Sequence, residues 1–325
     1  MAVPREPAFW YASTPPPWVL RPLAALYGGA VRLRRSLYRR GLLAHARLPV
    51  PVLVVGNLTI GGTGKTPLVI ALVEALRARG FRPGVVSRGY GGSATAPQLL
   101  EPGCEAQQVG DEPCLIRRHC GVPVAIGRER AVAAQLLVEA GADLVIADDG
   151  LQHYALARDV EICVIDGTRR FGNGRLLPAG PLREPLQRLA TVDYRVCNGG
   201  LARPDEVPLR LVEDRAYRLL APAVRVALAD VGARSVHAVA GIGNPERFFR
   251  SLRAQRFEVT AHAFPDHHLY RAADLDFGDD RPLLMTEKDA IKCRAFARPH
   301  WWAVPVRAVL PEDFFDALAD RLRES

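Results

Sequence analysis

The alternation of apolar and polar segments along the chain predicts strands that are followed by helices. Residues 50–57, VPVLVVGN, form a short β-branched run of the kind that is buried in a parallel sheet. Residues 66–80 continue with helical periodicity and end on a glycine. This order predicts an α/β protein with a doubly wound, mostly parallel sheet. Further strands are expected at residues 84–87, 122–126, 161–165 and 192–197, with another that runs from residue 142 into two aspartates.

The second part of the chain repeats this pattern after a break. The segment that follows Asn198, GGLARPDEVPLR, is punctuated by glycine and proline, which is typical of a linker. Residues 235–255 again show a strand, a glycine turn and a helix, and they predict a second, smaller α/β domain. We therefore expect an N-terminal helix within residues 1–48, a core domain at 49–200, a linker region at 201–234 and a smaller domain at 235–325.

The N-terminal segment predicts a basic amphipathic helix. Residues 18–48 contain seven arginines and no acidic residue, and the apolar run at 22–31 is too short to span a bilayer. Such a helix suits the interface of an anionic membrane, but packing on the protein's own core would require the same pattern, and both interpretations stay open here. At about 100° per residue, one arc holds Leu23, Leu26, Tyr27, Ala30, Val31, Leu33, Leu37 and Tyr38, opposite Arg21, Arg32, Arg35, Arg39 and Arg40.

Composition narrows the class of protein. The chain has 325 residues, 49% apolar and 24% charged, which describes a soluble chain with a sizeable core. Its net charge of +8 favours an anionic partner: nucleic acid, phospholipid or a phosphorylated substrate. The six cysteines show neither a C-x-x-C pair nor metal-ligand spacing, and no secretory signal is evident. We expect buried thiols in a cytoplasmic protein.

The loop between the first strand and helix carries a phosphate-binding motif. Residues 61–66, GGTGKT, supply the G-K-T ending of G-x-x-x-x-G-K-T, although the first glycine of that motif is replaced by Thr59. Lys65 is one of only three lysines among 43 lysine and arginine residues. A compact ammonium group can enter a ring of backbone amides and bridge two phosphates, whereas a planar guanidinium is too wide. We expect ATP to be held by Gly61, Gly62, Thr63, Gly64, Lys65 and Thr66.

Two adjacent acids predict a magnesium site. Asp148 and Asp149 end a buried strand in the manner of a Walker B segment, and two like charges are rarely placed together there without a cation. With the hydroxyl of Thr66, they are expected to hold Mg²⁺. Asp149 and Gly150 could alternatively form an ordinary turn.

Several loops rich in arginine and glycine are predicted beyond the carboxyl ends of the strands, where ligands bind in such sheets. Any one of them could be solvated surface, and their shared position is what favours an anion site. They are SRGYGG at 87–92, GDEP at 110–113, GRER at 127–130 and GNGRLLPAGPLREP at 172–185.

Together with AGIGNPERFF at 240–249, FPDHHLY at 264–270 and MTEKDAIK at 285–292, these motifs resemble the tetraacyldisaccharide 4'-kinase family. The resemblance covers residues from about 18 to 310 in the family's order. It implies a P-loop kinase that transfers the γ-phosphoryl group of ATP to the 4'-hydroxyl of a tetraacyldisaccharide 1-phosphate and produces lipid IVA for lipid A. An anionic lipid substrate favours the membrane interpretation of the N-terminal helix, at the cytoplasmic face of the inner membrane. No nucleic-acid or obligate protein partner is expected.

The resemblance also implies roles for individual residues. A sugar hydroxyl attacks poorly unless a base accepts its proton. By position in the family, that base is Asp111, assisted by His267 from the second domain. Arg130 and Arg183 would stabilise phosphate, with Glu184 as a possible orienter. Gln152 and His153 are expected to act only indirectly, and a zinc site at residues 266–268 is not expected because a further spaced ligand is lacking.

Two other functions fit parts of the pattern. A ParA/MinD-like ATPase also combines a glycine-rich G-K-T loop with a membrane helix, but it has a lysine where this chain has Ile60. A nucleic-acid-binding protein would suit the charge, yet no aromatic stacking platform accompanies the basic residues. TEKD at 286–289 lacks the spacing of the guanine signature N-K-x-D, so ATP is favoured over GTP. A hinge that closes on ATP is a further hypothesis.

Overall fold

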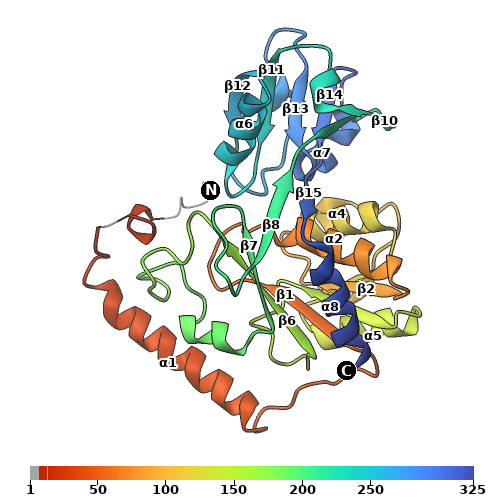
Figure 1. Cartoon of the computed structure of the whole chain (residues 1–325). Helices are drawn as coiled ribbons and strands as arrows, with labels where there is room; N and C mark the ends of the chain where they lie inside the picture. The colour runs from red at the N-terminus through yellow and green to blue at the C-terminus, as the bar shows by residue number, and fades with distance from the viewer. Residues whose placement is uncertain (1–6, 13) are drawn as a thin grey trace.

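The computed structural model describes residues 7–12 and 14–325, which form two sheets with helices on their faces (Figure 1). In the nine-stranded sheet all neighbouring pairs are parallel except those made by the two edge strands. The predicted doubly wound, mostly parallel α/β fold is confirmed. In spatial order the strands are β15 (Arg307–Val309), β8 (Val207–Val212), β7 (Tyr194–Asn198), β6 (Val160–Asp166), β1 (Val52–Gly56), β5 (Leu144–Asp148), β2 (Pro83–Ser87), β4 (Val124–Ile126) and β3 (Gln98–Leu99).

The alternation of side chains along β1 explains why helices cover both faces of this sheet. Leu53 and Val55 pack in the core beneath α2, α4 and α8, whereas Val52 and Val54 pack in the core on the side of α5. Every residue of β1 is therefore buried, as a two-sided parallel strand requires. The helices of this part are α2 (Lys65–Ala78), α3 (Ala106–Val109), α4 (Asp111–Cys120), α5 (Arg130–Glu139) and α8 (Glu312–Arg323).

The second sheet has six strands and its own core. Four strands are parallel, and β9 and β10 add an antiparallel edge. Phe248, Phe249 and Leu252 of α6 fill one face of this sheet. In spatial order the strands are β10 (Ala221–Ala227), β9 (Arg215–Arg218), β14 (Trp301–Val304), β13 (Leu283–Thr286), β11 (Ser235–Ala240) and β12 (Glu258–Ala263), with helices α6 (Pro245–Ala254) and α7 (Glu287–Cys293).

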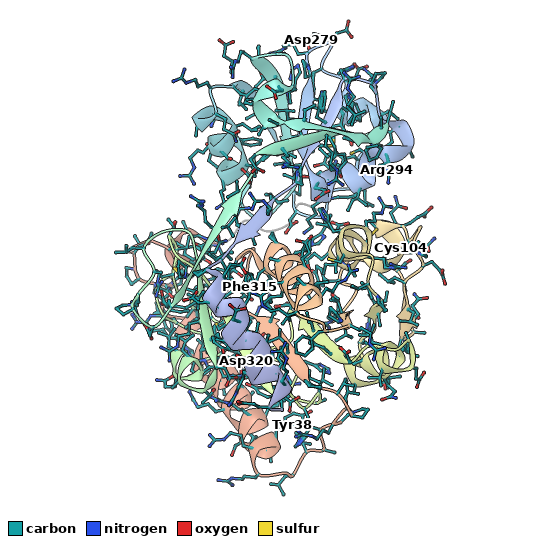
Figure 2. The ribbon with its side chains drawn as sticks, turned by 45° about the vertical axis from the view of Figure 1, so that its right-hand side comes forward. Tyr38, Cys104, Asp279, Arg294, Phe315 and Asp320 are labelled. Carbon is teal, nitrogen blue, oxygen red and sulfur yellow. The ribbon has the colours of Figure 1, made fainter. Side chains whose placement is uncertain are left out.

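The chain crosses between the sheets twice, and this differs from the expected division of the chain. Residues 201–234, expected as a linker, contain β8 of the first sheet and β9 and β10 of the second. The chain then returns through β15, which pairs with β8, and ends in α8 on the first sheet. Figure 2 shows Phe315 and Asp320 on α8 beside the nine-stranded part. Five short 3-10 helices complete the structure: Ala8–Trp10, Leu186–Thr191, Leu228–Asp230, Ala272–Leu275 and Arg294–Phe296.

Burial explains both differences. Along β8, Leu209 is buried in the core of the larger sheet, so this proline-containing segment is held by packing that its composition conceals. Three apolar residues of α8, Phe314, Phe315 and Leu318, are buried in the same core. The last helix therefore belongs with the first sheet, although it is the end of the segment expected to form the second domain.

Helix α1 (Leu20–Arg39) runs along one side of the nine-stranded part (Figure 1). Tyr27 donates a hydrogen bond from its hydroxyl to the carbonyl oxygen of Arg183 (2.9 Å), and Gly28 is buried against Leu176. A second apolar stripe on the same helix is exposed, with 71% exposure at Leu26 and 62% at Leu33. Both interpretations of the amphipathic pattern therefore describe part of this helix. Among the described residues, no helix is long and apolar enough to cross a bilayer.

All six cysteines are buried and free, as their spacing predicts. Burial raises the pKa of the thiols of Cys114, Cys120, Cys163 and Cys293 to about 12. These side chains are core residues.

Candidate active site

A cleft of about 2310 Å³ lies between the two sheets. One wall is formed by the glycine-rich loop before α2 and by the residues after β2 and β5. The other wall is formed by the turn after β11, residues 242–245, and by the loop after β12, residues 263–267. The two glycine turns approach closely, since a Cβ atom on Gly243 would lie 3.4 Å from the backbone nitrogen of Gly62. The sequence motifs of both parts therefore converge on one space.

The loop at residues 61–64 has the backbone that phosphate binding requires. Gly61 and Gly64 have positive φ angles of 99° and 90°, which side chains disfavour. Gly64 is the residue before α2, so the helix N-terminus opens toward the cleft. Asn198 donates a hydrogen bond from Nδ2 to the carbonyl oxygen of Thr63 (2.9 Å), and a Cβ on Gly64 would lie 2.5 Å from that nitrogen. The loop is thus fixed from below by β7.

Lys65 occupies an enclosed position at the base of this loop. Its side chain is only 12% exposed, and Nζ donates a hydrogen bond to Oδ1 of Asn57 (3.1 Å). The same nitrogen lies 3.4 Å from Oδ1 of Asp149. Thr66 follows at the start of α2 and lines the cleft. The six loop residues predicted to bind ATP therefore all border one end of the cleft.

Asp149 is the centre of a charge cluster. Nη1 of Arg183 donates to Oδ2 of Asp149 (3.0 Å), and Nη1 of Arg130 donates to its carbonyl oxygen (2.7 Å). Burial raises the pKa of Asp149, but Lys65 and Arg183 outweigh burial and hold the pKa well below its usual range. Asp149 has a φ of 48°, so the residue does lie in a turn, and its carboxylate is nonetheless aimed at the loop lysine.

Asp148 has the surroundings of a cation ligand. Its carboxyl group is buried, and neither oxygen has a hydrogen-bond partner among the described residues. Burial, together with the nearby charges of Glu112 and Asp149, raises the pKa of Asp148 to about 7. An orphaned carboxylate is costly, and a divalent cation bound by oxygen ligands would compensate it. The residues present at this point fit Mg²⁺.

Asp111 and His267 meet across the junction of the two parts. Asp111 is the first residue of α4 and is 7% exposed, and His267 lies on the loop after β12. Nδ1 of His267 is 3.0 Å from Oδ2 of Asp111, and the ring of Tyr90 lies edge-on to the imidazole. Burial raises the pKa of Asp111, but the hydrogen bond from His267 and the charges of Lys292 and Lys288 outweigh it, so the pKa is lowered.

Two lysines of α7 also reach this junction, and sequence reasoning did not identify them. Nζ of Lys288 lies 3.2 Å from Oδ1 of Asp266 and 3.6 Å from Oε1 of Glu112. Nζ of Lys292 lies 3.4 Å from Oδ2 of Asp111. The rarity of lysine in this chain was a signal that could have found them, because Lys65, Lys288 and Lys292 are its only lysines.

Glu184 lies behind the cleft. It is 1% exposed, accepts a hydrogen bond from the Tyr154 hydroxyl, and accepts another from Nε2 of Gln152 (3.1 Å). Oε1 of Gln152 in turn accepts from Nη1 of Arg183 (3.5 Å). Glu184 therefore contacts the phosphate-facing arginine only through Gln152.

His153 borders the cleft among arginines. Burial first, and then the charges of Arg130, Arg158 and Arg34, lower the pKa of His153 to about 4. The imidazole is therefore neutral at neutral pH. At the other wall, the two adjacent histidines have different partners: His267 pairs with Asp111, and Nε2 of His268 lies 3.2 Å from Oδ2 of Asp274.

Comparison with known proteins finds relatives over nearly the whole chain. Residues 16–323 match the profile of the tetraacyldisaccharide-1-P 4'-kinase family. Proteins named tetraacyldisaccharide 4'-kinase from Stenotrophomonas maltophilia and Xanthomonas euvesicatoria are each 52% identical, over 98% of this chain and 96% of theirs. The fold is similar to that of LpxK from Aquifex aeolicus, crystallised in complex with ATP, with a TM-score of 0.77, 28% identity and coverage of 94% and 97% of the two chains. The similarity therefore includes both sheets.

Proposed function

This chain belongs to the tetraacyldisaccharide-1-P 4'-kinase family, and on that premise we propose how its residues carry out the reaction. The chain is an ATP-dependent kinase that phosphorylates the 4'-hydroxyl of tetraacyldisaccharide 1-phosphate to give lipid IVA in lipid A biosynthesis. The proposal about its residues rests on one observation: a phosphate loop and a buried Asp–His pair, contributed by different parts of the chain, adjoin a single cleft.

The phosphates of ATP are held by the loop at residues 61–66. Its backbone amides and the N-terminus of α2 face the cleft, and Lys65 is enclosed where it can bridge two phosphate groups. Arg130 and Arg183 lie beside Asp149 at the same end and add positive charge for the phosphoryl group in transfer. These groups are placed before the substrate arrives, so little reorganisation is needed during the reaction.

Thr66, Asp148 and Asp149 would hold Mg²⁺. The orphaned oxygens of Asp148 support this assignment most strongly. A bound Mg²⁺ supplies positive charge that neutralises the phosphate oxygens. Lys65 and Arg183 already balance Asp149, so Asp148 is the carboxylate that most needs a cation.

Asp111 acts as the general base. It takes the proton of the 4'-hydroxyl while that oxygen forms a bond to the γ-phosphorus and the bond to the β–γ bridging oxygen breaks, which leaves ADP. A low pKa keeps the carboxylate ionised at neutral pH, and His267 orients it through the 3.0 Å contact. Because Asp111 and His267 belong to different parts, the base is complete only when the two parts are together.

The exposed stripe of α1 places the enzyme on a membrane surface. Trp18, Leu23, Leu26 and Leu33 are 51% to 78% exposed, and arginines flank them on the same helix. Apolar side chains next to cationic ones suit the headgroup region of an anionic leaflet. The acylated substrate resides in such a leaflet, so peripheral association with the cytoplasmic face of the inner membrane follows.

The proposal is tested by transfer of labelled phosphate from γ-labelled ATP to tetraacyldisaccharide 1-phosphate in detergent micelles, resolved by thin-layer chromatography. We expect labelled lipid in the presence of Mg²⁺ and none when the metal is chelated. Release of free phosphate without labelled lipid would instead indicate a hydrolytic switch of the ParA/MinD type. Full activity after removal of all divalent cations would contradict the roles of Asp148 and Thr66.

A further inference from the structure

The three lysines of the chain all lie at the active site, and only one has been given a role. The chain contains 43 lysine and arginine residues, of which only Lys65, Lys288 and Lys292 are lysine. Helix α7, which carries the last two, packs against α4, whose first residue is Asp111 (Figure 1). The motif MTEKDAIK thus lies directly against the proposed base.

Lys292 is the more deeply buried of the two. Its side chain is 4% exposed, against 16% for Lys288. Its Nζ atom lies 3.4 Å from Oδ2 of Asp111 and 3.2 Å from Oδ1 of Asp289. Among the described residues this nitrogen has no partner in hydrogen-bond geometry, so it acts on both carboxylates through its charge. A buried ammonium in this position is compensated only by those two acids.

Asp289 fixes Lys292 to the six-stranded sheet. Oδ2 of Asp289 accepts hydrogen bonds from the backbone nitrogen of Gly241 (2.9 Å) and from the hydroxyl of Thr286 (2.5 Å). The other carboxylate oxygen, Oδ1, faces Lys292. The ammonium group is therefore held at a defined point of the second part, from which it reaches the base on the first part.

The contacts to Asp111 are unequal on its two oxygens. Nδ1 of His267 and Nζ of Lys292 both approach Oδ2, at 3.0 and 3.4 Å. A carboxylate engaged on one oxygen by two donors presents the other oxygen, Oδ1, to a third group. The acceptor hydroxyl of the substrate is the group that needs it.

We propose that Lys292 is a positioning residue for phosphoryl transfer: its ammonium keeps the Asp111 carboxylate ionised and engages Oδ2, so that Oδ1 receives the proton of the acceptor hydroxyl. This inference rests on the proposed role of Asp111 as the base. Lys292 itself contacts neither ATP nor the lipid in this account. A lysine suits the position because a guanidinium is too wide for the enclosed space between two carboxylates.

The charges around Asp111 set the sign of the expected pH effect. Burial raises the pKa of Asp111, and the hydrogen bond from His267 and then the charge of Lys292 lower it. Without Lys292 the pKa rises, so the base becomes protonated at a higher pH than in the wild type. The titratable groups that face Asp111 or influence it from the surrounding elements are His267, Tyr270, Lys288, Lys292, Glu112 and Cys114.

The test is the pH dependence of kcat and kcat/KM for Lys292→Met, which removes the charge and retains most of the length of the side chain. We expect the acid limb of the profile to move upward by about one pH unit or more, which is a tenfold loss per unit at low pH. KM for ATP should stay close to the wild-type value. Arg298→Met removes an exposed cation of the same part, paired with Asp276 at 3.3 Å, and should leave the profile unchanged.

A purely structural ion pair would behave differently. It would lower the melting temperature, or reduce kcat equally at every pH, and leave the acid limb in place, and either result would overturn the proposal. If Lys292→Met does not fold, Lys292→Arg keeps the charge and should keep the wild-type limb; an upward shift there would count against the proposal. Asp111→Asn separates the two levels: substantial activity in that variant removes the base itself, whereas an inactive Asp111→Asn with a wild-type profile for Lys292→Met removes only the role of Lys292.

Discussion

At the scale of single residues, the choice between lysine and arginine marks the site. Lys65 lies between Asn57 and Asp149 with little exposure, in a space that suits a point charge. Arginines occupy the more open positions: Arg183 is 27% exposed and contacts Asp149 from the cleft side. The protein uses lysine where a cation must be enclosed and arginine where it can spread along a surface.

Lys65→Arg should therefore abolish turnover even though it keeps the charge. We expect kcat to fall by on the order of 10²–10³, the loss seen when one preorganised donor to the transition state is removed. The measurement is steady-state transfer of labelled phosphate. Arg79→Lys, at the exposed end of the same helix, exchanges the same two residue types and should remain near wild type. Near-normal activity in Lys65→Arg would refute the steric argument.

Residue identity predicted part of this site and missed the rest. The motif spacing places Lys65, Asp148 and Asp149 together because strand, loop and helix are local features. Lys288 and Lys292 were missed because their partners, Glu112 and Asp111, lie far away in sequence and meet them only through the packing of α7 on α4. Such contacts depend on how two sheets are joined, which local pattern does not encode.

At the scale of elements, the contact between α4 and α7 joins the two parts beside the base. Nε2 of His119, on α4, lies 2.6 Å from Oε2 of Glu287, on α7. Glu287 also accepts a hydrogen bond from the hydroxyl of Tyr217 (2.8 Å). The bond to Glu287 raises the pKa of His119 above its ordinary value, against the opposing effect of burial.

This contact should make stability depend on pH with a defined sign. A raised histidine pKa stabilises the folded state fully below the unfolded value, about 6.5, and the contribution is lost as pH rises through the higher folded pKa. The difference in melting temperature between wild type and Glu287→Gln should therefore shrink as pH rises above about 6.5. Gln can still accept from Tyr217, so only the charged pair is removed. A difference that is constant from pH 5.5 to 8.5, or that grows with pH, would contradict this account.

The amphipathic helix α1 is the element whose two faces have different functions. Tyr27 and Gly28 pack on the protein, while Leu26 and Leu33 are exposed. The sequence predicted the apolar arc but could not divide it, because the division depends on where the helix touches residues more than a hundred positions away.

Leu26→Glu or Leu33→Glu should weaken membrane binding without unfolding the protein. Removing one inserted leucine costs roughly 1.5–3 kcal/mol, so partitioning onto vesicles of phosphatidylglycerol and phosphatidylethanolamine should fall about tenfold or more. Sedimentation with vesicles measures it. Leu201→Glu changes an equally exposed leucine, 90% exposed, away from α1 and should have little effect. Unchanged partitioning of both α1 variants would rule out this face as the membrane contact.

At the scale of the whole molecule, two crossings of the chain hold the parts together around the cleft. The pairing of β15 with β8 was not predicted, since a proline-containing segment and a three-residue strand carry little pattern of their own. The consequence is functional. The second part is inserted between strands of the first, so its glycine turn faces the phosphate loop and its His267 faces Asp111.

This arrangement predicts that nucleotide binding changes the relation between the parts. The turn at Gly243 lies so close to Gly62 that the phosphates of ATP cannot enter between them without movement. X-ray scattering in solution, with and without a non-hydrolysable ATP analogue and Mg²⁺, should give different curves. Identical curves at saturating nucleotide would argue against a hinge.

The central claim is that Asp111 is the base, and the most direct measurement is the kinetics of Asp111→Ala together with its affinity for ATP. We predict that kcat for transfer of labelled phosphate to the lipid falls by about 10²–10⁴, the usual contribution of a general base. The Kd for ATP should be little changed, because the phosphate loop is separate from the base. Near-normal kcat, or a loss confined to ATP binding, would contradict the account.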